Sequence, residues 1–365
     1  MRVLVYGLST QLGGVESFFI NYYRAMKNNN LDITCDSIGV KNCVLENEIK
    51  AYGGKCYGIT GEYKNYIKEF FKKHHNLYDL LWANLVDASD IEVIKAAKKS
   101  GIKVIVHSHS SSIMVPGLYG KYRKLRHLIN RELLNYYSDE YWACSDLAAK
   151  WMFSKRIINQ NKDRFIPNAI DAKRFRFNSA ERRSQRAEAY ENQIFIGYIG
   201  RFSFEKNPIF AVKIFQEIQK KNQNSKLLMF GDGEMLNVVK DYIKEKEINN
   251  VELLGVCKDI DKKMQILDCV IIPSLFEGMP MVALEAQAAG LHVFASGDNI
   301  SKQTKIVSEM DFIKLSDGPE IWANAILKSN LGRRDTFHEI VKNGFEINSA
   351  SITLYNYFLN LINLE

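Results

Sequence analysis

The sequence contains no apolar run that could span a membrane. No stretch of about eighteen consecutive apolar residues occurs anywhere in the 365-residue chain. Met1 and Arg2 lead directly into the strand-like residues 3–6, without the apolar region and small-residue cleavage site of a secretory signal. We therefore expect a cytoplasmic protein.

The cysteines lack the spacing of a metal site or a redox pair. The six are scattered, no two of them form a CxxC motif, and several fall in strand-like apolar runs. Cysteine in such a position behaves as a small apolar residue. We predict that all six are reduced residues, most of them in the core: Cys35, Cys43, Cys56, Cys144, Cys257 and Cys269.

The familiar nucleotide-binding fingerprints are also missing. The loop after the first predicted strand, Gly7-Leu-Ser-Thr-Gln-Leu-Gly13-Gly14, is neither a GxGxxG motif nor a Walker loop. No acidic residue follows where an NAD-binding domain needs one, which argues against a dehydrogenase. Zinc-finger and RNP motifs are absent too, so nucleic acid is not an expected partner.

Positive charge is concentrated in the first half of the chain. Residues 1–170 hold 24 Lys and Arg against 16 Asp and Glu, whereas residues 171–365 hold 25 against 26. The densest cluster, residues 121–131, has helical spacing, with Leu125, Leu128, Ile129 and Leu133 available for one face. Such a helix fits two interpretations, a solvated surface helix or peripheral contact with an anionic membrane at the inner face of the plasma membrane.

Short apolar runs alternate with helix-length segments almost throughout the chain, which is typical of parallel sheets covered by helices. The alternation predicts an α/β fold with two doubly wound domains, and the polar, highly charged segment 171–192 is the expected linker. Helical patterns at 335–346 and 348–363 close the chain. The predicted strands are 2–7, 32–38, 54–58, 79–84, 102–107 and 139–143 in the first domain and 194–199, 226–230, 250–254, 268–272, 291–295 and 311–314 in the second.

In such sheets ligands bind beyond the carboxyl ends of the strands, so the loops after strands are the candidate sites. In the first domain, Gly13 and Gly14 could let the backbone approach a ligand at the start of a helix, although an ordinary flexible loop explains them equally well. His109 follows the strand at 102–107 and could hydrogen-bond a hydroxyl group. A surface histidine without a role remains the alternative.

The loop after the strand at 194–199 carries two cations. Arg201 and Lys206 precede Pro208, which is suited to open a helix, and cations at such a place suit a diphosphate. Solvated surface cations are the alternative. Gly231-Asp-Gly-Glu234 holds the same position after the next strand, where a simple turn would explain it as well.

The most informative block is Glu277-Gly-Met-Pro-Met-Val-Ala-Leu-Glu285-Ala-Gln-Ala-Ala-Gly290. It follows a buried strand and a turn, with Pro280 as the expected first residue of a helix. A helix N-terminus favours anions and hydroxyl acceptors, and Glu277 could accept hydrogen bonds from sugar hydroxyls. Glu285 lies just over one turn later among apolar residues, either facing solvent or binding something.

Taken together, these blocks resemble the retaining GT-B glycosyltransferases of family 4, also called group 1. The order GGVE, HSHSS, IPNAID, GRFSFEKNP, GDGE and EGMPMVALEAQAAG matches that family across nearly the whole chain, with Glu277 and Glu285 as its E-x7-E pair. The closest similarity is to bacterial capsule, exopolysaccharide and O-antigen transferases. One departure is His292, which stands where the family commonly has proline.

The resemblance implies two Rossmann-like domains facing a cleft. Residues 1–170 would bind the acceptor, residues 171–347 the nucleotide, and the helix at 348–363 would pack back on the first domain. Arg201 and Lys206 would hold the donor diphosphate and Glu285 the ribose hydroxyls. The donor sugar would be surrounded by Glu277 and by the backbone of Gly278, Met279, Pro280 and Met281. In the first domain, Gly13 and Gly14 would approach the diphosphate and His109 the sugar.

The activity implied is transfer of a sugar from a nucleotide sugar, by family frequency a UDP-sugar, to a saccharide hydroxyl. Acceptors in the family are often linked to polyprenyl diphosphate, which would explain a basic, membrane-seeking half. Catalysis would use front-face attack, with Arg201, Lys206 and helix N-termini neutralising the leaving diphosphate, and with Glu277 and His109 in supporting roles. Neither a cofactor nor a metal is expected.

Three alternatives remain open. Asp259-Ile-Asp261 spells the DxD motif of metal-dependent transferases, but its place at a helix start explains it without a metal. A nucleotide-sugar epimerase or a glycoside phosphorylase could share the fold. A non-catalytic nucleotide-sugar-binding protein is the third alternative, although the intact Glu277/Glu285 and Arg201/Lys206 pairs argue against it.

Overall fold

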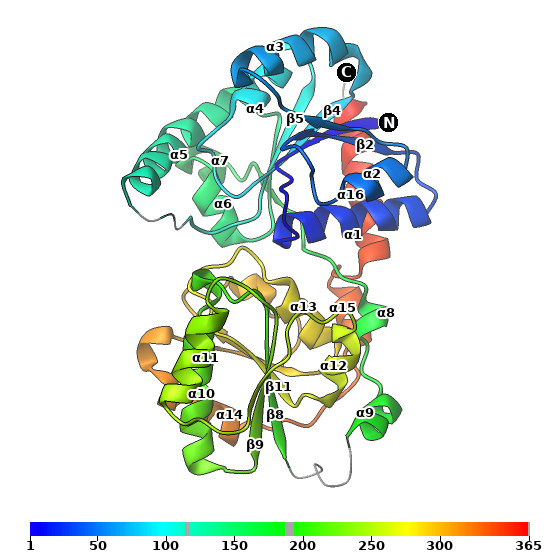
Figure 1. Ribbon diagram of the computed structural model, residues 1–365. Helices are drawn as coiled ribbons and strands as arrows, with labels where there is room; N and C mark the ends of the chain where they lie inside the picture. Colours follow the sequence, from blue (N-terminus) through cyan, green and yellow to red (C-terminus); the bar gives the residue numbers. More distant parts are fainter. Residues whose placement is uncertain (114, 116, 187–192, 364–365) are drawn as a thin grey trace. The chain divides into compact units, whose positions relative to one another are not determined.

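The chain folds into two compact α/β units. The computed structural model describes residues 1–113, 115, 117–186 and 193–363. The first unit comprises Met1–Ala169 and Glu346–Glu365, and the second Ile170–Phe345. Each unit is built on one parallel sheet with helices packed against it (Figure 1). The predicted fold class, two doubly wound parallel-sheet domains, is confirmed.

The first domain has a seven-stranded sheet in the order β3-β2-β1-β4-β5-β6-β7. Its strands are β1 (Arg2–Tyr6), β2 (Thr34–Gly39), β3 (Cys56–Gly58), β4 (Leu80–Leu85), β5 (Lys103–Ser108), β6 (Glu140–Ala143) and β7 (Asp163–Phe165). Its helices are α1 (Gly14–Asn28), α2 (Glu46–Ala51), α3 (Tyr63–His74), η1 (His75–Leu77), α4 (Glu92–Lys99), α5 (Gly117–Tyr137), α6 (Asp146–Met152), α7 (Lys155–Asn159) and α16 (Ile347–Ile362).

The second domain has a six-stranded sheet in the order β10-β9-β8-β11-β12-β13. Its strands are β8 (Ile194–Ile199), β9 (Ser225–Phe230), β10 (Val251–Leu253), β11 (Cys269–Ile272), β12 (His292–Ser296) and β13 (Met310–Ile313). Its helices are α8 (Ala172–Phe175), α9 (Ser179–Gln185), η3 (Phe204–Lys206), α10 (Pro208–Lys221), α11 (Leu236–Glu245), α12 (Ile260–Ile266), α13 (Met281–Ala288), η4 (Lys302–Thr304), η5 (Leu315–Asp317), α14 (Pro319–Lys328) and α15 (Phe337–Lys342).

Each sheet has one point at which the strand order reverses. The reversal lies between β1 and β4 in the first domain and between β8 and β11 in the second. Loops that leave two adjacent strands at such a point run to opposite faces of the sheet and open a crevice at its carboxyl edge, where ligands of doubly wound proteins bind. The topology therefore directs attention to the loops after β1, β4, β8 and β11.

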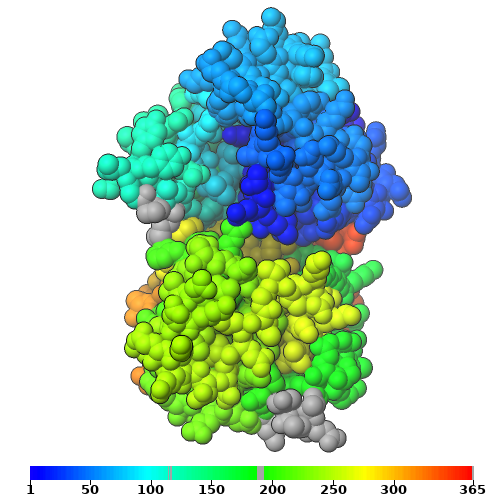
Figure 2. Space-filling view, in the orientation of Figure 1, coloured from blue at the N-terminus to red at the C-terminus, as the bar shows by residue number. Residues whose placement is uncertain are grey.

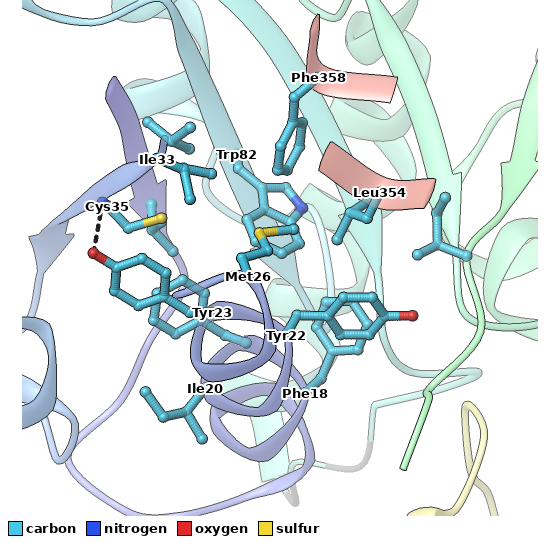
Figure 3. Packing of buried hydrophobic residues seen from close by; sticks show 14 of the residues in the cluster. Phe18, Ile20, Tyr22, Tyr23, Met26, Ile33, Cys35, Trp82, Leu354 and Phe358 are labelled. Carbon is cyan, nitrogen blue, oxygen red and sulfur yellow. Dashed lines mark hydrogen bonds between the residues drawn. The ribbon is translucent and has the colours of Figure 1, made fainter. Parts of the chain in front are cut away.

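The chain returns to the first domain for its last helix. α16 lies beside α1, and its Leu354 and Phe358 pack into the same buried cluster as Phe18 and Trp82 (Figure 3). The Phe358 ring meets the Trp82 ring edge to face, with 5.2 Å between the centroids. Removing this helix would expose the centre of that core, so α16 is an integral part of the first domain.

All twelve predicted strands are present, each within two residues of its predicted bounds. β7 was missed because its sequence, Asp163-Arg-Phe165, is short and polar and its residues lie at the sheet edge, where no apolar run is needed. His292, the departure from the family pattern, begins a regular β12 and contacts Asp311 at 2.9 Å through Nε2.

The predicted linker at 171–192 is wrong for its described part. Residues 172–175 and 179–185 form α8 and α9, which belong to the second unit. Arg182 donates to the Asp268 carboxylate at 2.5 Å, and Arg186 donates to it at 2.9 Å. The dense charge of this segment thus serves ion pairs within a domain, which composition alone cannot distinguish from a solvated linker. Residues 187–192 lie outside the described residues.

All six cysteines are described and none forms a disulfide; four are buried, and Cys56 and Cys257 are half-buried. None of the helices in the described ranges combines the length and apolarity needed to cross a bilayer.

Candidate functional site

The loops after β8 and β11 meet at the reversal point of the second sheet. The Glu205 carbonyl accepts a hydrogen bond from the Leu275 N–H at 2.7 Å, and Asn207 Nδ2 donates to the Pro273 carbonyl at 3.1 Å. Asn207 adopts a left-handed conformation, φ 54°, immediately before Pro208 opens α10 as predicted. These contacts bring two segments that are about seventy residues apart in the chain into one loop cluster.

Lys206 and Glu277 form an ion pair at this cluster. Lys206 Nζ donates to Glu277 Oε1, and Ser274 Oγ donates to the same oxygen at 3.0 Å. The Lys206 side chain is 28% exposed and the Glu277 side chain only 12%. Two of the predicted site residues are thus in direct contact, with the cation on the more accessible side. Arg201, earlier in the same loop, is exposed.

Tyr198 of β8 contacts the loop that carries Arg201 and Lys206. Its hydroxyl donates to the Arg201 carbonyl at 3.0 Å and lies 3.5 Å from the Lys206 carbonyl, so one side chain holds both ends of the loop. Burial, together with the charges of Glu277 and Glu205, raises the pKa of Tyr198. This role is not visible in the sequence, since a tyrosine inside a strand gives no sign of what its hydroxyl contacts.

The Gly231-Asp-Gly-Glu234 segment packs against the same loop. Phe202 N–H donates to the Asp232 carbonyl at 2.9 Å, and Met235 N–H donates to the Phe202 carbonyl at 2.8 Å. A Cβ at Gly231 would lie 1.9 Å from the Gly200 carbonyl oxygen, and one at Gly233 would lie 2.5 Å from that of Phe202. The glycines allow this close approach, so their visible role is to hold the Arg201 loop.

α13 begins one residue later than predicted. Pro280 is the N-cap rather than the first helical residue, and Met281 starts the helix. The first N–H groups of the helix, at Met281 and Val282, have no carbonyl within it to bond, which leaves them available to a ligand. Gly278 and Pro280 are buried, and Met279 is 4% exposed, so this turn is held firmly.

Glu285 lies on α13 among a different set of neighbours. Its carboxylate is half-buried and makes no hydrogen bond with any described residue. Burial raises the pKa of Glu285 to about 7, opposed by the nearby Arg174 cation and assisted by Asp261. A carboxylate that is desolvated but not hydrogen-bonded is poised to accept bonds from a ligand. Arg174 and Asp261 were not predicted as its neighbours.

The two carboxylates of the DxD sequence, Asp259 and Asp261, accept hydrogen bonds from different partners. Asp261 Oδ1 accepts from Arg174 Nη2 at 2.7 Å, and Asp259 accepts from the Cys257 thiol at 2.9 Å. The thiol bond lowers the pKa of Asp259. Asp259 is the N-cap residue of α12, but its side chain makes no capping bond. Across the described ranges, no cluster of three or more His, Cys, Asp or Glu side chains could hold a metal ion.

In the first domain, the loop after β1 is closed by Glu16. Its buried carboxylate accepts from the Ser9 N–H at 2.8 Å and from the Gly13 N–H at 3.0 Å. Gly7 needs to be glycine, because its φ is +104° and a Cβ would lie 1.8 Å from the Asn84 carbonyl oxygen. Gly14 begins α1, and a Cβ there would meet no atom within 4 Å. The fold itself therefore does not require glycine at Gly14.

His109 follows β5 and is oriented by Asn84. Its Nε2 lies 2.8 Å from Asn84 Oδ1, so we assign the proton to Nε2 as donor. Burial lowers the pKa of His109 to about 3, which keeps the ring neutral near pH 7. The Phe18 ring packs against it at 4.8 Å between centroids. A neutral, oriented imidazole suits hydrogen bonding to a hydroxyl and not charge stabilisation.

The first domain also has a pocket of about 530 Å³ between β3 and α3. Tyr57, Tyr66 and Phe70 supply aromatic surface, and Glu62 and Glu69 are its acids. No predicted site residue lines it. We therefore keep the loops at the reversal points as the candidate site.

Comparisons with known proteins identify the family of the second domain. Residues 179–312, most of the second domain, match the family model described as glycosyl transferases group 1. The second domain is a glycosyl transferases group 1 domain. The resemblance inferred from the sequence is thereby confirmed at the level of the family.

Two relatives of the chain are glycosyltransferases by name. The chain is 26% identical over 330 residues to the "Putative glycosyltransferase EpsF" of Bacillus subtilis, covering 87% of this chain and 84% of the relative. It is 27% identical over 220 residues to the UDP-Gal:alpha-D-GlcNAc-diphosphoundecaprenol alpha-1,3-galactosyltransferase of Escherichia coli, covering 56% of each. The crystal structure of Anabaena Alr3699/HepE in complex with UDP superposes with a TM-score of 0.72 at 17% identity, covering 99% of this chain and 97% of that one. At this identity the superposition shows the shared GT-B fold.

Proposed function

We propose that this group 1 glycosyltransferase moves a sugar from a UDP-sugar to a saccharide hydroxyl, with retention of configuration at the transferred carbon. The Lys206–Glu277 pair at the reversal point of the second sheet carries the proposal. It places a cation and a carboxylate beside the helix N-termini of α10 and α13, where a diphosphate and a polyhydroxylated sugar can be bound together. Glu285 would accept the ribose hydroxyls.

One relative and one structural neighbour support the choice of substrates. The Escherichia coli relative is named for a UDP-Gal donor and a diphosphoundecaprenol-linked acceptor, and the Anabaena neighbour was solved with UDP. We extend these to a uridine nucleotide and a lipid-linked saccharide in bacterial surface polysaccharide synthesis. A lipid-linked acceptor also requires peripheral contact with a membrane, which the basic first domain would favour.

The proposed reaction is a front-face displacement. The bond between the sugar C1 and the diphosphate oxygen breaks, and a bond from the acceptor hydroxyl oxygen to C1 forms on the same face. The acceptor proton passes to the leaving phosphate oxygen. Lys206, Arg201 and the N–H groups of α13 would stabilise the charge that develops on the diphosphate. Glu277 would orient Lys206 and the sugar hydroxyls, and no residue here is assigned as a nucleophile.

The first-domain residues are proposed to contact the substrates. The neutral His109 ring would hydrogen-bond a sugar hydroxyl, and the loop at Gly13 and Gly14 would approach a bound phosphate through its backbone. This assignment gives a reason for glycine at Gly14 that the fold does not supply. Neither a cofactor nor a metal has a part in the proposed reaction.

The donor is tested by a thermal-shift panel of UDP, GDP, ADP and their sugars, because a ligand that binds only the folded state raises its melting temperature. We expect a shift with UDP and with one UDP-sugar, and no shift in the Lys206→Ala variant. A shift with GDP-sugars alone would overturn the choice of base. Conversion of the UDP-sugar to its epimer without any acceptor would indicate an epimerase.

The stereochemistry is tested on the product. NMR of the anomeric proton, followed from the first turnover with a synthetic lipid-linked acceptor, gives the configuration of the new bond. Inversion would refute the front-face reaction. A parallel assay with EDTA, and with magnesium or manganese restored, tests the metal. Activity that is lost with EDTA and regained with the ion would refute metal independence.

A further inference from the structure

α5 presents most of its large apolar residues to solvent, while two of its polar residues are buried against the protein. Its buried residues are Gly120, His127, Asn130 and Leu134. In contrast, Leu118 is 82% exposed, Leu125 56% and Ile129 57%. Of the twenty large apolar side chains that are exposed among the described residues, seven lie on this one helix: Leu118, Tyr119, Tyr122, Leu125, Leu128, Ile129 and Tyr136.

Two buried polar side chains of α5, His127 and Asn130, bond the helix to the domain. The buried His127 ring accepts from the Ala88 N–H at 3.0 Å through Nδ1 and faces the Trp151 carbonyl at 3.1 Å through Nε2. It also stacks on the Trp151 ring at 4.0 Å. Asn130 Nδ2 donates to the Ala88 carbonyl at 2.8 Å. Rotating the helix to bury its apolar side would break these buried bonds, so the outward orientation is built in.

Five of the seven exposed residues lie along one side of the helix. At about 100° per residue, Leu118, Tyr122, Leu125, Ile129 and Tyr136 fall within about 60° of one another around the helix axis. They extend over roughly 27 Å at 1.5 Å per residue. We call these five residues the α5 stripe. Figure 2 shows residues 117–137, in teal, at the surface of the first domain.

Cations flank the stripe on both sides. By the same helical geometry, Lys121 lies about 70° to one side of its centre and Arg126 about 70° to the other, with Lys124 about 60° beyond Lys121. Arg126 also packs over the Tyr122 ring at 5.8 Å. Arg123 is not part of this flank, because it is paired with Asp87 at 2.6 Å. The one acid of the helix is Glu132, which lies 3.9 Å from Arg131.

We propose that the α5 stripe docks on an anionic lipid bilayer, with its Leu, Ile and Tyr side chains at the level of the headgroups and Lys121, Lys124 and Arg126 at the lipid phosphates. The chemistry fits a lipid surface, which offers apolar depth and negative charge along one line. It does not fit a second copy of this chain, because two stripes facing one another would bring like-charged flanks together in a domain with 24 cations against 18 acids.

The inference rests on the proposed function, since a lipid-linked acceptor is what would bring the enzyme to a membrane. It adds which surface meets the bilayer. The stripe contains none of the residues that we assign to the donor or acceptor, so binding to vesicles and binding of UDP can be measured separately.

The experiment is co-sedimentation of the full chain with phosphatidylcholine vesicles, with and without about 30% phosphatidylglycerol. We expect binding only to the anionic vesicles, weakening as salt rises. The Leu125→Ser/Ile129→Ser variant should lose binding at all salt concentrations. Neutralising the flanks with Lys121→Gln, Lys124→Gln and Arg126→Gln should lower the partition coefficient roughly 100-fold, at about one kcal/mol for each cation.

Matched controls come from α11 of the second domain, where Val238 is 53% exposed and Lys240 and Lys244 are exposed. Val238→Ser and Lys240→Gln/Lys244→Gln should bind vesicles like the unaltered chain. Equal binding of the α5 and α11 variants, or no binding to anionic vesicles, would overturn the inference. So would a dimer in solution that the Leu125→Ser/Ile129→Ser change converts to a monomer, because the stripe would then be a protein interface.

The two proposals can fail independently. If the chain binds UDP but not vesicles, the docking surface is wrong and the donor site stands. If it binds vesicles through α5 but shows no thermal shift with any nucleotide, the proposed function is wrong instead. The salt titration on the unaltered chain needs no variant and therefore does not depend on the variants folding.

Discussion

Replacing Glu285 by glutamine should remove the part of the pH dependence of nucleotide binding that comes from the Glu285 carboxylate. The Glu285 carboxylate is half-buried without a hydrogen bond, and its pKa is raised to about 7 by burial. If ribose hydroxyls donate to it, only the ionised form binds well. Affinity for UDP should then be full above pH 7 and fall as the pH drops below 7.

The size of the effect follows from these values. Near pH 8, a hydrogen bond to the ionised carboxylate contributes about 1.5–3 kcal/mol, so Glu285→Gln should weaken UDP binding by about 2 kcal/mol, roughly 30-fold. Near pH 5.5, ionising a group with a pKa of about 7 costs roughly 2 kcal/mol. That cost cancels the advantage of the carboxylate, and the two proteins should bind UDP about equally.

The assay is isothermal titration calorimetry with UDP at a series of pH values, comparing the two proteins at each pH. The terminal phosphate of UDP titrates in the same range, but its effect is common to both proteins and cancels in the ratio of their dissociation constants. A ratio that stays constant from about pH 5.5 to pH 8.5 would refute the assignment of Glu285 to the ribose.

Stability provides the internal control. Because the folded-state pKa of Glu285 lies above its ordinary value of 4.5, its contribution to stability is greatest at low pH and is lost as the pH rises through 7. Glu285→Gln should therefore raise the stability of the second domain near pH 8, by roughly 1–3 kcal/mol. Weaker binding in a more stable protein cannot be attributed to unfolding.

Three further predictions concern other parts of the molecule. Glu277→Gln should lower turnover but leave UDP binding intact or tighten it, since an acid beside the diphosphate is removed. Lys206→Ala leaves the 12% exposed Glu277 unpaired and should destabilise the domain by about 1–3 kcal/mol. Combining the two changes should restore that stability in chemical denaturation. Gly7→Ala should cost more than about 2 kcal/mol of stability, because its Cβ would clash and its φ is positive. Gly14→Ala should not lower the melting temperature. Any rise in the KM of the Gly14→Ala variant for the donor would therefore reflect lost contact with the ligand. Asp268→Asn should destabilise the second domain by roughly 2–3 kcal/mol, because its carboxylate accepts two guanidinium groups and the backbone of β8; an unchanged denaturation midpoint would contradict the packing of α9.

Sheet architecture was predictable because it is encoded locally. Buried parallel strands need continuous apolar runs, and each such run from residues 2–7 to 311–314 corresponds to a strand. β7 and the packing of α8 and α9 were not predictable in this way. They depend on a sheet edge and on ion pairs to Asp268, about eighty residues further along the chain, and neither leaves a local pattern.

The candidate site was predictable in its composition but not in its internal contacts. Motif order gave Arg201, Lys206, Glu277 and Glu285, of which the first three follow strand ends and the last lies on α13. The bond between Lys206 and Glu277, however, depends on β8 and β11 being neighbours in the sheet. Sequence order does not show which strands are adjacent, and the hydroxyl of Tyr198 that holds the cation loop is equally invisible without the fold.

α5 shows why periodicity alone could not decide its role. The spacing of its leucines correctly indicated an amphipathic helix, and the usual inference is that the apolar side is buried. The orientation of α5 about its own axis is decided instead by His127 and Asn130, whose buried hydrogen bonds to the Ala88 backbone hold that side of the helix against the domain. A buried polar group without partners costs more than an apolar side chain left exposed, so these few bonds outweigh the helical pattern. Replacing His127 and Asn130 together by leucine removes that constraint and should let the helix bury its stripe, and loss of anionic-vesicle binding with retained helicity in circular dichroism would be the expected result.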